Sequence, residues 1–114
     1  MVIRMEETAA ALTVWLSGEL DHHAARSLRE QVDAAVTRST VTTLRLDFSG
    51  VTFMDSSGIG LIMGRYRLMQ SRGGRVLVVG ASERLLRVMK FAGLERLPVW
   101  ETQPASTKQG VRKS

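Results

Sequence analysis

Two serines and an aspartate stand together where a polar loop meets an apolar helical pattern. The segment reads Phe53-Met54-Asp55-Ser56-Ser57-Gly58-Ile59-Gly60. Carboxylate and hydroxyl oxygens at a helix start accept hydrogen bonds from amides that lack a partner inside the helix, and the helix dipole favours negative charge there. A phosphate added to such a serine would meet the same amides. The segment therefore predicts a charge switch that phosphorylation operates, although a plain helix cap is the simpler alternative.

The residues on either side predict that this segment joins a strand to a helix. Upstream, residues 43–48 alternate between apolar and polar side chains, which is typical of a half-buried strand. Downstream, apolar side chains recur at the spacing of one helical face, namely Ile59, Ile62, Met63, Tyr66 and Met69. Asp55, Ser56 and Ser57 are thus expected at the start of this helix. Capping preference explains one polar residue there, but it does not explain three in succession.

A second strand-to-helix junction lies nearer the N-terminus. It reads Leu16-Ser17-Gly18-Glu19-Leu20-Asp21-His22-His23. Gly18 gives the backbone freedom where the strand ends, and Asp21 is expected to cap a helix that runs to about residue 37. Helices that follow parallel strands return over the sheet in right-handed crossovers. Both junctions are therefore expected at the same end of one sheet.

The rest of the chain alternates between strand and helix patterns. Strands are expected at residues 2–5 and 11–17 as a hairpin, at 41–48, at 76–79 as a central strand covered on both faces, and at 97–100 as a short final strand. The helix after Asp55 should stop at Gly73-Gly74, and Ser82 should cap a third helix with Leu85, Val88 and Met89 inward. The fold class is therefore α/β, with a mixed, mostly parallel sheet that begins with a β-hairpin and carries helices packed on it.

Composition bounds the function further. The chain has 114 residues and no cysteine, which excludes disulfides, thiolate metal sites and cysteine catalysis. Its apolar runs are far shorter than the roughly 20 residues that a membrane span needs, and charged residues near the N-terminus interrupt any signal-peptide pattern. We expect a cytoplasmic domain over residues 1–102, without a membrane partner, and a polar tail over 103–114 that is disordered or partly helical.

The net charge of +5 is unevenly distributed along the chain. Residues 1–60 hold five arginines against eight acidic residues, a net charge of −3, and residues 61–114 hold eleven basic against three acidic residues, a net charge of +8. The basic half is either a solvated face or a surface that meets an acidic protein. The few aromatic residues offer little for stacking on bases, so we expect no nucleic-acid partner.

Both junctions resemble the STAS domains of anti-sigma factor antagonists, most of all those of the sporulation sigma-F type. The Met54–Gly60 segment is similar to the family's phosphorylation motif, and Leu16–His23 to its first strand-to-helix junction. The resemblance implies the STAS fold and makes Ser56 the phosphorylated residue. The partner-binding residues that it implies are Asp21, Asp55, Ser56, Ser57, Gly58 and Gly60. The tail departs from the family, whose members commonly close with an amphipathic helix there.

The resemblance also implies a mechanism and its partners. The unphosphorylated chain is expected to bind an anti-sigma factor that is also a serine kinase and to release its sigma factor. The kinase would use its own bound ATP, a phosphoserine phosphatase would reverse the modification, and the free chain would be a monomer without cofactor or metal. Two alternatives are an antagonist in a general-stress sigma pathway and a STAS interaction module that binds a small anion or nucleotide at the same helix start.

Enzyme functions are disfavoured by what surrounds the serines. Residues 56–60 resemble the end of the glycine-rich loop of short-chain dehydrogenases, but the glycine spacing is wrong by one and the partner Tyr-x-x-x-Lys motif is absent. A hydrolytic serine needs a base with its own orienting group, and the adjacent His22 and His23 are better explained as a first helical turn. We therefore expect no catalytic residue, and we attribute the glycines after Ser57 to close packing of the helix on the sheet.

Overall fold

A computed structural model describes residues 1–101, so the predicted tail at 103–114 lies outside the described residues. Its strands are β1 (Val2–Glu7), β2 (Ala11–Leu20), β3 (Thr43–Met54) and β4 (Arg75–Val79). Its helices are α1 (His22–Thr37), α2 (Ser56–Ser71) and α3 (Glu83–Phe91), followed by the 3₁₀ turn η1 (Leu94–Arg96).

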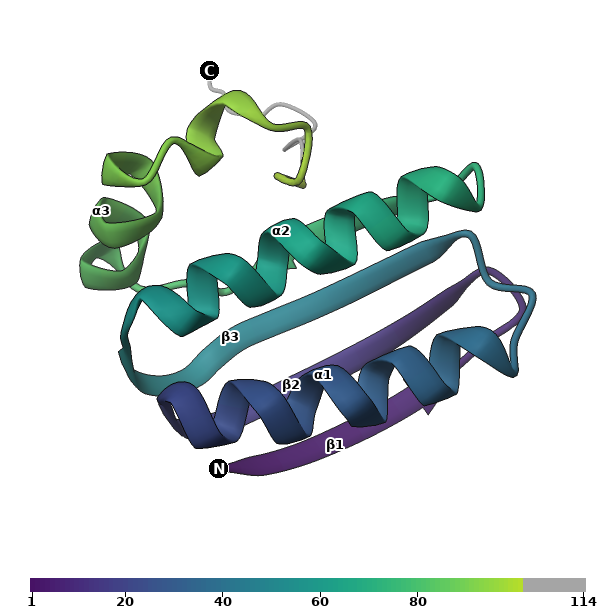
Figure 1. The fold of residues 1–114 in the computed structure, drawn as a ribbon, viewed down its shortest axis with the longest axis horizontal. Helices are drawn as coiled ribbons and strands as arrows, with labels where there is room; N and C mark the ends of the chain where they lie inside the picture. The colour runs from purple at the N-terminus through teal and green to yellow at the C-terminus, as the bar shows by residue number, and fades with distance from the viewer. Residues whose placement is uncertain (102–114) are drawn as a thin grey trace, which may run out of the picture.

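The sheet has the strand order β1-β2-β3-β4, with β1 and β2 antiparallel and the remaining pairs parallel. This confirms the predicted α/β class with a mixed sheet that opens on a hairpin. Figure 1 shows α1 and α2 side by side over the same face of the sheet, as two right-handed crossovers require. The hairpin turn is closed by Thr8, whose amide donates to the Ala11 carbonyl at 2.8 Å.

The core lies between that sheet face and the two helices. Alternate side chains of the strands are buried there, as the period-2 pattern predicts. They include Leu12, Val14 and Leu16 of β2 and Leu44, Leu46 and Phe48 of β3. The predicted inward face of α1 is confirmed, because Ala25, Leu28, Val32 and Val36 are all buried.

The buried face of α2 differs from the one predicted. Ile62 and Met69 are buried as expected, whereas Ile59, Met63 and Tyr66 are only half-buried. Leu61 and Arg65 are buried in their place. The reason is that α2 packs against α1 as well as against the sheet, which turns its buried face toward the neighbouring helix. Periodicity within one helix carries no information on that second neighbour.

Four further expectations about the strands and α3 were wrong. Strand β3 does not stop at residue 48 but continues to Met54. In the described part of the chain β4 ends the sheet rather than lying at its centre, and the predicted final strand reduces to one parallel bridge between Val78 and Trp100. The Val99 amide, which would extend that pairing, donates instead to the Leu97 carbonyl at 2.8 Å. Val88 is 37% exposed because the short helix α3 buries only the narrow stripe of Leu85 and Met89.

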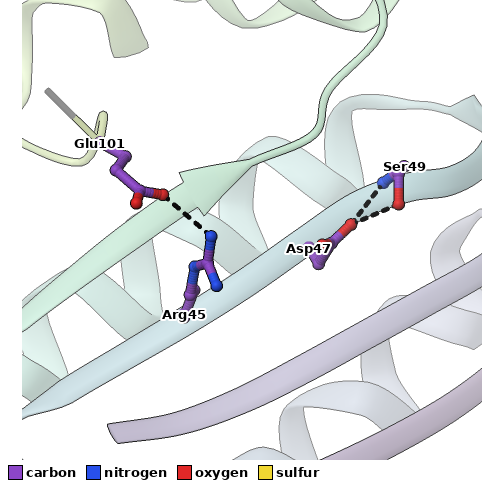
Figure 2. A network of polar contacts seen from close by, with 4 residues as sticks. All are labelled: Arg45, Asp47, Ser49 and Glu101. Atoms are coloured by element: carbon purple, nitrogen blue, oxygen red, sulfur yellow. Dashed lines mark hydrogen bonds and ion pairs between the residues drawn. The ribbon is translucent and has the colours of Figure 1, made fainter. Parts of the chain in front are cut away.

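Polar side chains occupy the opposite face of β3, away from α1 and α2. Figure 2 shows Arg45 paired with Glu101, and Asp47 accepting hydrogen bonds from the amide and the hydroxyl of Ser49. Arg45 Nη2 lies 3.1 Å from Glu101 Oε1. The Ser49 amide lies 2.9 Å from the Asp47 carboxylate. These contacts hold the strand where it bends past Ser49 and tie the end of the described chain to the sheet. They have no part in the helix-start site.

Candidate functional site

The ends of β2 and β3 bring the two predicted junctions together. The parallel pairing of these strands runs to its last pair, Leu20 with Met54, so each strand ends beside the other. The amide of Asp55 then donates to the carbonyl of Leu20 at 3.4 Å. The two helix starts are therefore joined through backbone atoms, at the same sheet end as the parallel crossovers predict.

Glycines permit the close approach of the two strands before that point. Gly50 has no room for a side chain, because a Cβ there would lie 2.6 Å from Ser17 Oγ and 2.7 Å from the Leu16 carbonyl oxygen. Gly18 adopts a φ of 104°, a region that side chains other than glycine avoid. The β2–β3 pairing shifts register just before Ser17 and just after Gly18. Strand β2 is therefore irregular in the residues that precede its end at Leu20.

Each helix start is capped by an aspartate. Asp21 Oδ1 accepts from the Ala24 amide at 2.9 Å, and Asp55 Oδ1 accepts from the Ser57 amide at 2.8 Å. Both aspartates have the extended backbone of an N-cap. The hydrogen bond from Ala24 lowers the pKa of Asp21 below its ordinary value of 3.8. The predicted capping role of Asp21 is confirmed, and Asp55 takes the same role at α2.

Since Asp55 caps α2, neither serine hydroxyl is needed as the cap acceptor. Ser56 is the first residue of α2 and is exposed, and within residues 1–101 its hydroxyl makes no hydrogen bond. Ser57 is half-buried, and its Oγ lies 3.5 Å from His22 Nδ1 at the start of α1. The Ser57 amide donates to Asp55, and the Ser57 hydroxyl faces the neighbouring helix.

The glycines of α2 have different surroundings. A Cβ on the buried Gly58 would overlap Met54 Cγ and lie 3.1 Å from Leu20 Cδ2, so this glycine packs against both junctions. A Cβ on Gly60 or Gly64 would meet nothing within 4 Å. The attribution of these glycines to close packing on the sheet is therefore correct for Gly58 and wrong for Gly60 and Gly64.

An open groove of about 550 Å³ separates the starts of α1 and α2. We call it the α1–α2 groove, and its lining residues are His22, Ala25, Arg26, Arg29, Ser57, Gly60, Leu61, Gly64 and Arg65. Arg65 lies 2.9 Å from Asp33 in an ion pair. Burial lowers the pKa of Arg65, and the nearby Arg29 adds to this effect while Asp33 opposes it. The groove is thus basic and begins beside Ser57.

Sequence reasoning missed two contributors to this end of the molecule. The first is the set of groove arginines, for which the signal was available: Arg26 and Arg29 are three apart and so share a helix face. The second is the exposure of Phe53, the first residue of the Phe53–Gly60 segment, which is 48% exposed. An exposed aromatic ring there gives the surface an apolar contact point.

Residues 1–101 contain no group of three or more histidine, cysteine, aspartate or glutamate residues placed to hold a metal ion. No helix in the same range has the length and apolar character needed to cross a membrane.

Known proteins match both the sequence and the geometry. Residues 2–108 match the family model for the STAS domain. The anti-sigma F factor antagonist of Lysinibacillus sphaericus is 40% identical over 87 residues, which cover 76% of this chain and 74% of the relative. The solved structure of the anti-sigma factor antagonist SpoIIAA in its unphosphorylated form has a TM-score of 0.78 at 33% identity and covers 92% of both chains. The phosphorylated form of SpoIIAA, a Bacillus cell fate determinant, has a TM-score of 0.70 at 33% identity over 92% of this chain and 96% of that one.

Proposed function

The chain belongs to the STAS domain family, and we propose that it acts there as an anti-sigma factor antagonist in the sigma-F pathway of sporulation. Its unphosphorylated form binds an anti-sigma factor, and the sigma factor is released to activate transcription. The relative named as an anti-sigma F factor antagonist and the fold shared with SpoIIAA support this function. The main structural support for this function is that Ser56, at the start of α2, is exposed and that its hydroxyl does not act as the helix cap.

Ser56 is the residue that phosphorylation modifies in this proposal. Its hydroxyl is free because the Asp55 carboxylate already occupies the cap position, and its side chain faces solvent where a kinase can reach it. Ser57 is a poorer acceptor because it is half-buried against His22. The relation of this chain to a structure solved in a phosphorylated form agrees with a serine switch.

The physical effect of the phosphate is local. A phosphoserine carries about −1.5 to −2 charges near neutral pH. Here the charge would stand in the middle of the proposed partner surface, which consists of Asp21, Asp55, Ser56, Ser57 and Gly60. Gly58, which the resemblance also implied, is buried beneath this surface. Covering it with a packed protein surface costs several kcal/mol, and about 1.4 kcal/mol already weakens binding tenfold. Release of the anti-sigma factor therefore requires no change of fold.

The partners follow from this mechanism. The anti-sigma factor is itself the serine kinase and supplies its own bound ATP, and a separate phosphatase removes the phosphate. The chain acts as a substrate of these proteins and not as an enzyme, and it works as a monomer in the cytoplasm, where sigma factors meet RNA polymerase. The two nearby carboxylates, Asp21 and Asp55, are engaged in capping contacts with the backbone amides of Ala24 and Ser57.

The test is a phosphorylation reaction with the anti-sigma factor kinase of the same organism. The chain is incubated with the kinase and Mg-ATP, and its intact mass is followed with time. We expect a gain of one phosphate in the parent and in Ser57→Ala, and none in Ser56→Ala, which should still bind the kinase. Full labelling of Ser56→Ala would refute the assignment of the acceptor. Tight nucleotide binding to the chain without any transfer would refute the switch itself.

A further inference from the structure

The α1–α2 groove contains glycines that the fold does not need. Gly60 and Gly64 lie inside α2, where glycine destabilises a helix by about 1 kcal/mol relative to alanine. An added Cβ at either position would meet no atom within 4 Å, so packing does not require glycine there. Both line the groove. Their effect is to leave the backbone of α2 uncovered along one wall, so the groove is deeper than alanines would allow.

The same groove carries more cationic groups than anions. Arg26, Arg29 and Arg65 line it, and among residues 1–101 the only carboxylate paired with any of them is that of Asp33. The Arg65 side chain is 9% exposed, and its Nη1 has no hydrogen-bond acceptor. Its Nε also lacks an aligned acceptor, although Asp33 is near. A buried guanidinium with unused donors is costly, and an incoming anionic oxygen would relieve that cost.

The position of the groove connects it to the proposed partner surface. It opens beside Ser57 and His22, next to Ser56 along the same helix start. Its volume of about 550 Å³ exceeds that of a small inorganic ion and suits several side chains of a protein segment. The groove is continuous with the proposed partner surface and is positively charged. Both properties favour an acidic segment of the same protein that is proposed to cover Ser56.

We propose that the α1–α2 groove receives a carboxylate-bearing segment of the anti-sigma factor, with the carboxylate paired to Arg26, Arg29 and Arg65. The proposal rests on the proposed function and adds the chemistry of the partner. Arginine suits this role because its planar donors match a carboxylate in two parallel hydrogen bonds. It also gives the phosphate on Ser56 a second effect, since the phosphate repels the acidic segment as well as resisting burial.

The first test removes charge from the groove. Affinity for the purified anti-sigma factor is measured by calorimetry for the parent and for the double variant Arg26→Gln/Arg29→Gln. The matched control is Arg38→Gln/Arg75→Gln, which removes the same number of charges from exposed positions at the far end of α1 and at the start of β4. We expect at least about a tenfold loss of affinity in the double variant and a change of less than about twofold in the control. Added NaCl should weaken the parent more than the double variant.

The second test fills the groove without touching the core. Gly64→Ala and Gly64→Leu add side chains where no protein atom stands within 4 Å of the new Cβ. Both variants should melt at the same temperature as the parent or higher, while affinity for the anti-sigma factor falls with the size of the side chain. A loss of affinity with folding intact supports an occupied groove. Unchanged affinity in Gly64→Leu would overturn it.

The outcomes separate this proposal from the proposed function. If the parent fails to bind the anti-sigma factor at all, the proposed function fails. If the parent binds and the groove variants bind equally well, the groove proposal is overturned and the function stands. Sedimentation of the chain alone and thermal shifts with inorganic phosphate address other occupants. Two further outcomes would overturn the proposal. In the first the parent self-associates and in the second phosphate stabilises it, while in both the groove variants lose that property and still bind the partner with unchanged affinity.

Discussion

Alanine at Gly58 and alanine at Gly60 should have opposite effects on stability, although the two glycines are two residues apart in α2. At Gly58 the new Cβ would overlap the buried side chain of Met54 and press on Leu20. At Gly60 it would point into open space. The pair therefore separates packing at the two junctions from the general preference of helices for alanine.

The magnitudes follow from two terms. Replacing glycine by alanine inside a helix gains up to about 1 kcal/mol of folding free energy. Overpacking a filled site costs typically about 1–3 kcal/mol. Gly60→Ala should thus be as stable as the parent or up to about 1 kcal/mol more stable, and Gly58→Ala should lose up to about 2 kcal/mol. In a domain of this size about 1 kcal/mol shifts the melting temperature by about 4–8 °C.

Urea unfolding at neutral pH, followed by circular dichroism, measures both variants against the parent. Met54 and Leu20 form the last pair of the β2–β3 ladder, so strain at Gly58 reaches both helix starts. We expect Gly58→Ala also to be phosphorylated more slowly than Gly60→Ala. Equal unfolding midpoints for the two variants would refute the reasoning, because Met54 would then have moved aside at no measurable cost.

Three further outcomes are expected. The hydrogen bond from the Ala24 amide lowers the pKa of Asp21 below 3.8, so the ionised Asp21 carboxylate stabilises the folded parent. This stabilisation is fully present above pH 3.8 and is lost as the pH falls through the folded-state pKa. Asp21→Asn, which does not titrate, should therefore differ most from the parent near neutral pH and least at about pH 2 in thermal unfolding. Asp33→Asn should destabilise the fold by about 1–3 kcal/mol in urea because it leaves Arg65 buried without an anion, and Arg65→Met added to it should recover part of that loss. Ser56→Asp should keep the parent's melting temperature or raise it, since negative charge at an exposed helix start is favourable by about 0.3–1 kcal/mol, while calorimetry shows loss of anti-sigma factor binding.

Sequence reasoning succeeded for features that neighbouring residues determine. Asp21 and Ser82 cap their helices as predicted, with Ser82 Oγ accepting from the Leu85 amide at 3.2 Å. Gly73, with a φ of 74°, ends α2 where the glycine pair indicated. Such signals act within a few residues, so the local sequence contains all of their physics.

It failed where a second element decides the outcome. Arg65 follows the apolar pattern of α2 closely enough to be buried, but only α1, which contributes Asp33, makes that burial tolerable. The continuous apolar run from Val76 to Val79 suggested a central strand, because hydrophobicity reports burial and not position in the sheet. The candidate site shows the same division: the resemblance indicated Asp55 and Ser56, while the groove beside them arises only when two helices pack together.

The last pair of the β2–β3 ladder, Leu20 with Met54, has a consequence for folding in the cell. These residues are 34 positions apart, and their pairing is completed only after α1 has crossed over and both strands have aligned. The two helix starts cannot reach their mutual positions in a chain whose sheet is unfinished. Under the proposed function, a partner that contacts both helix starts at once would therefore distinguish the folded domain from a partly folded one. Binding at this surface would then report that the β2–β3 pairing is complete.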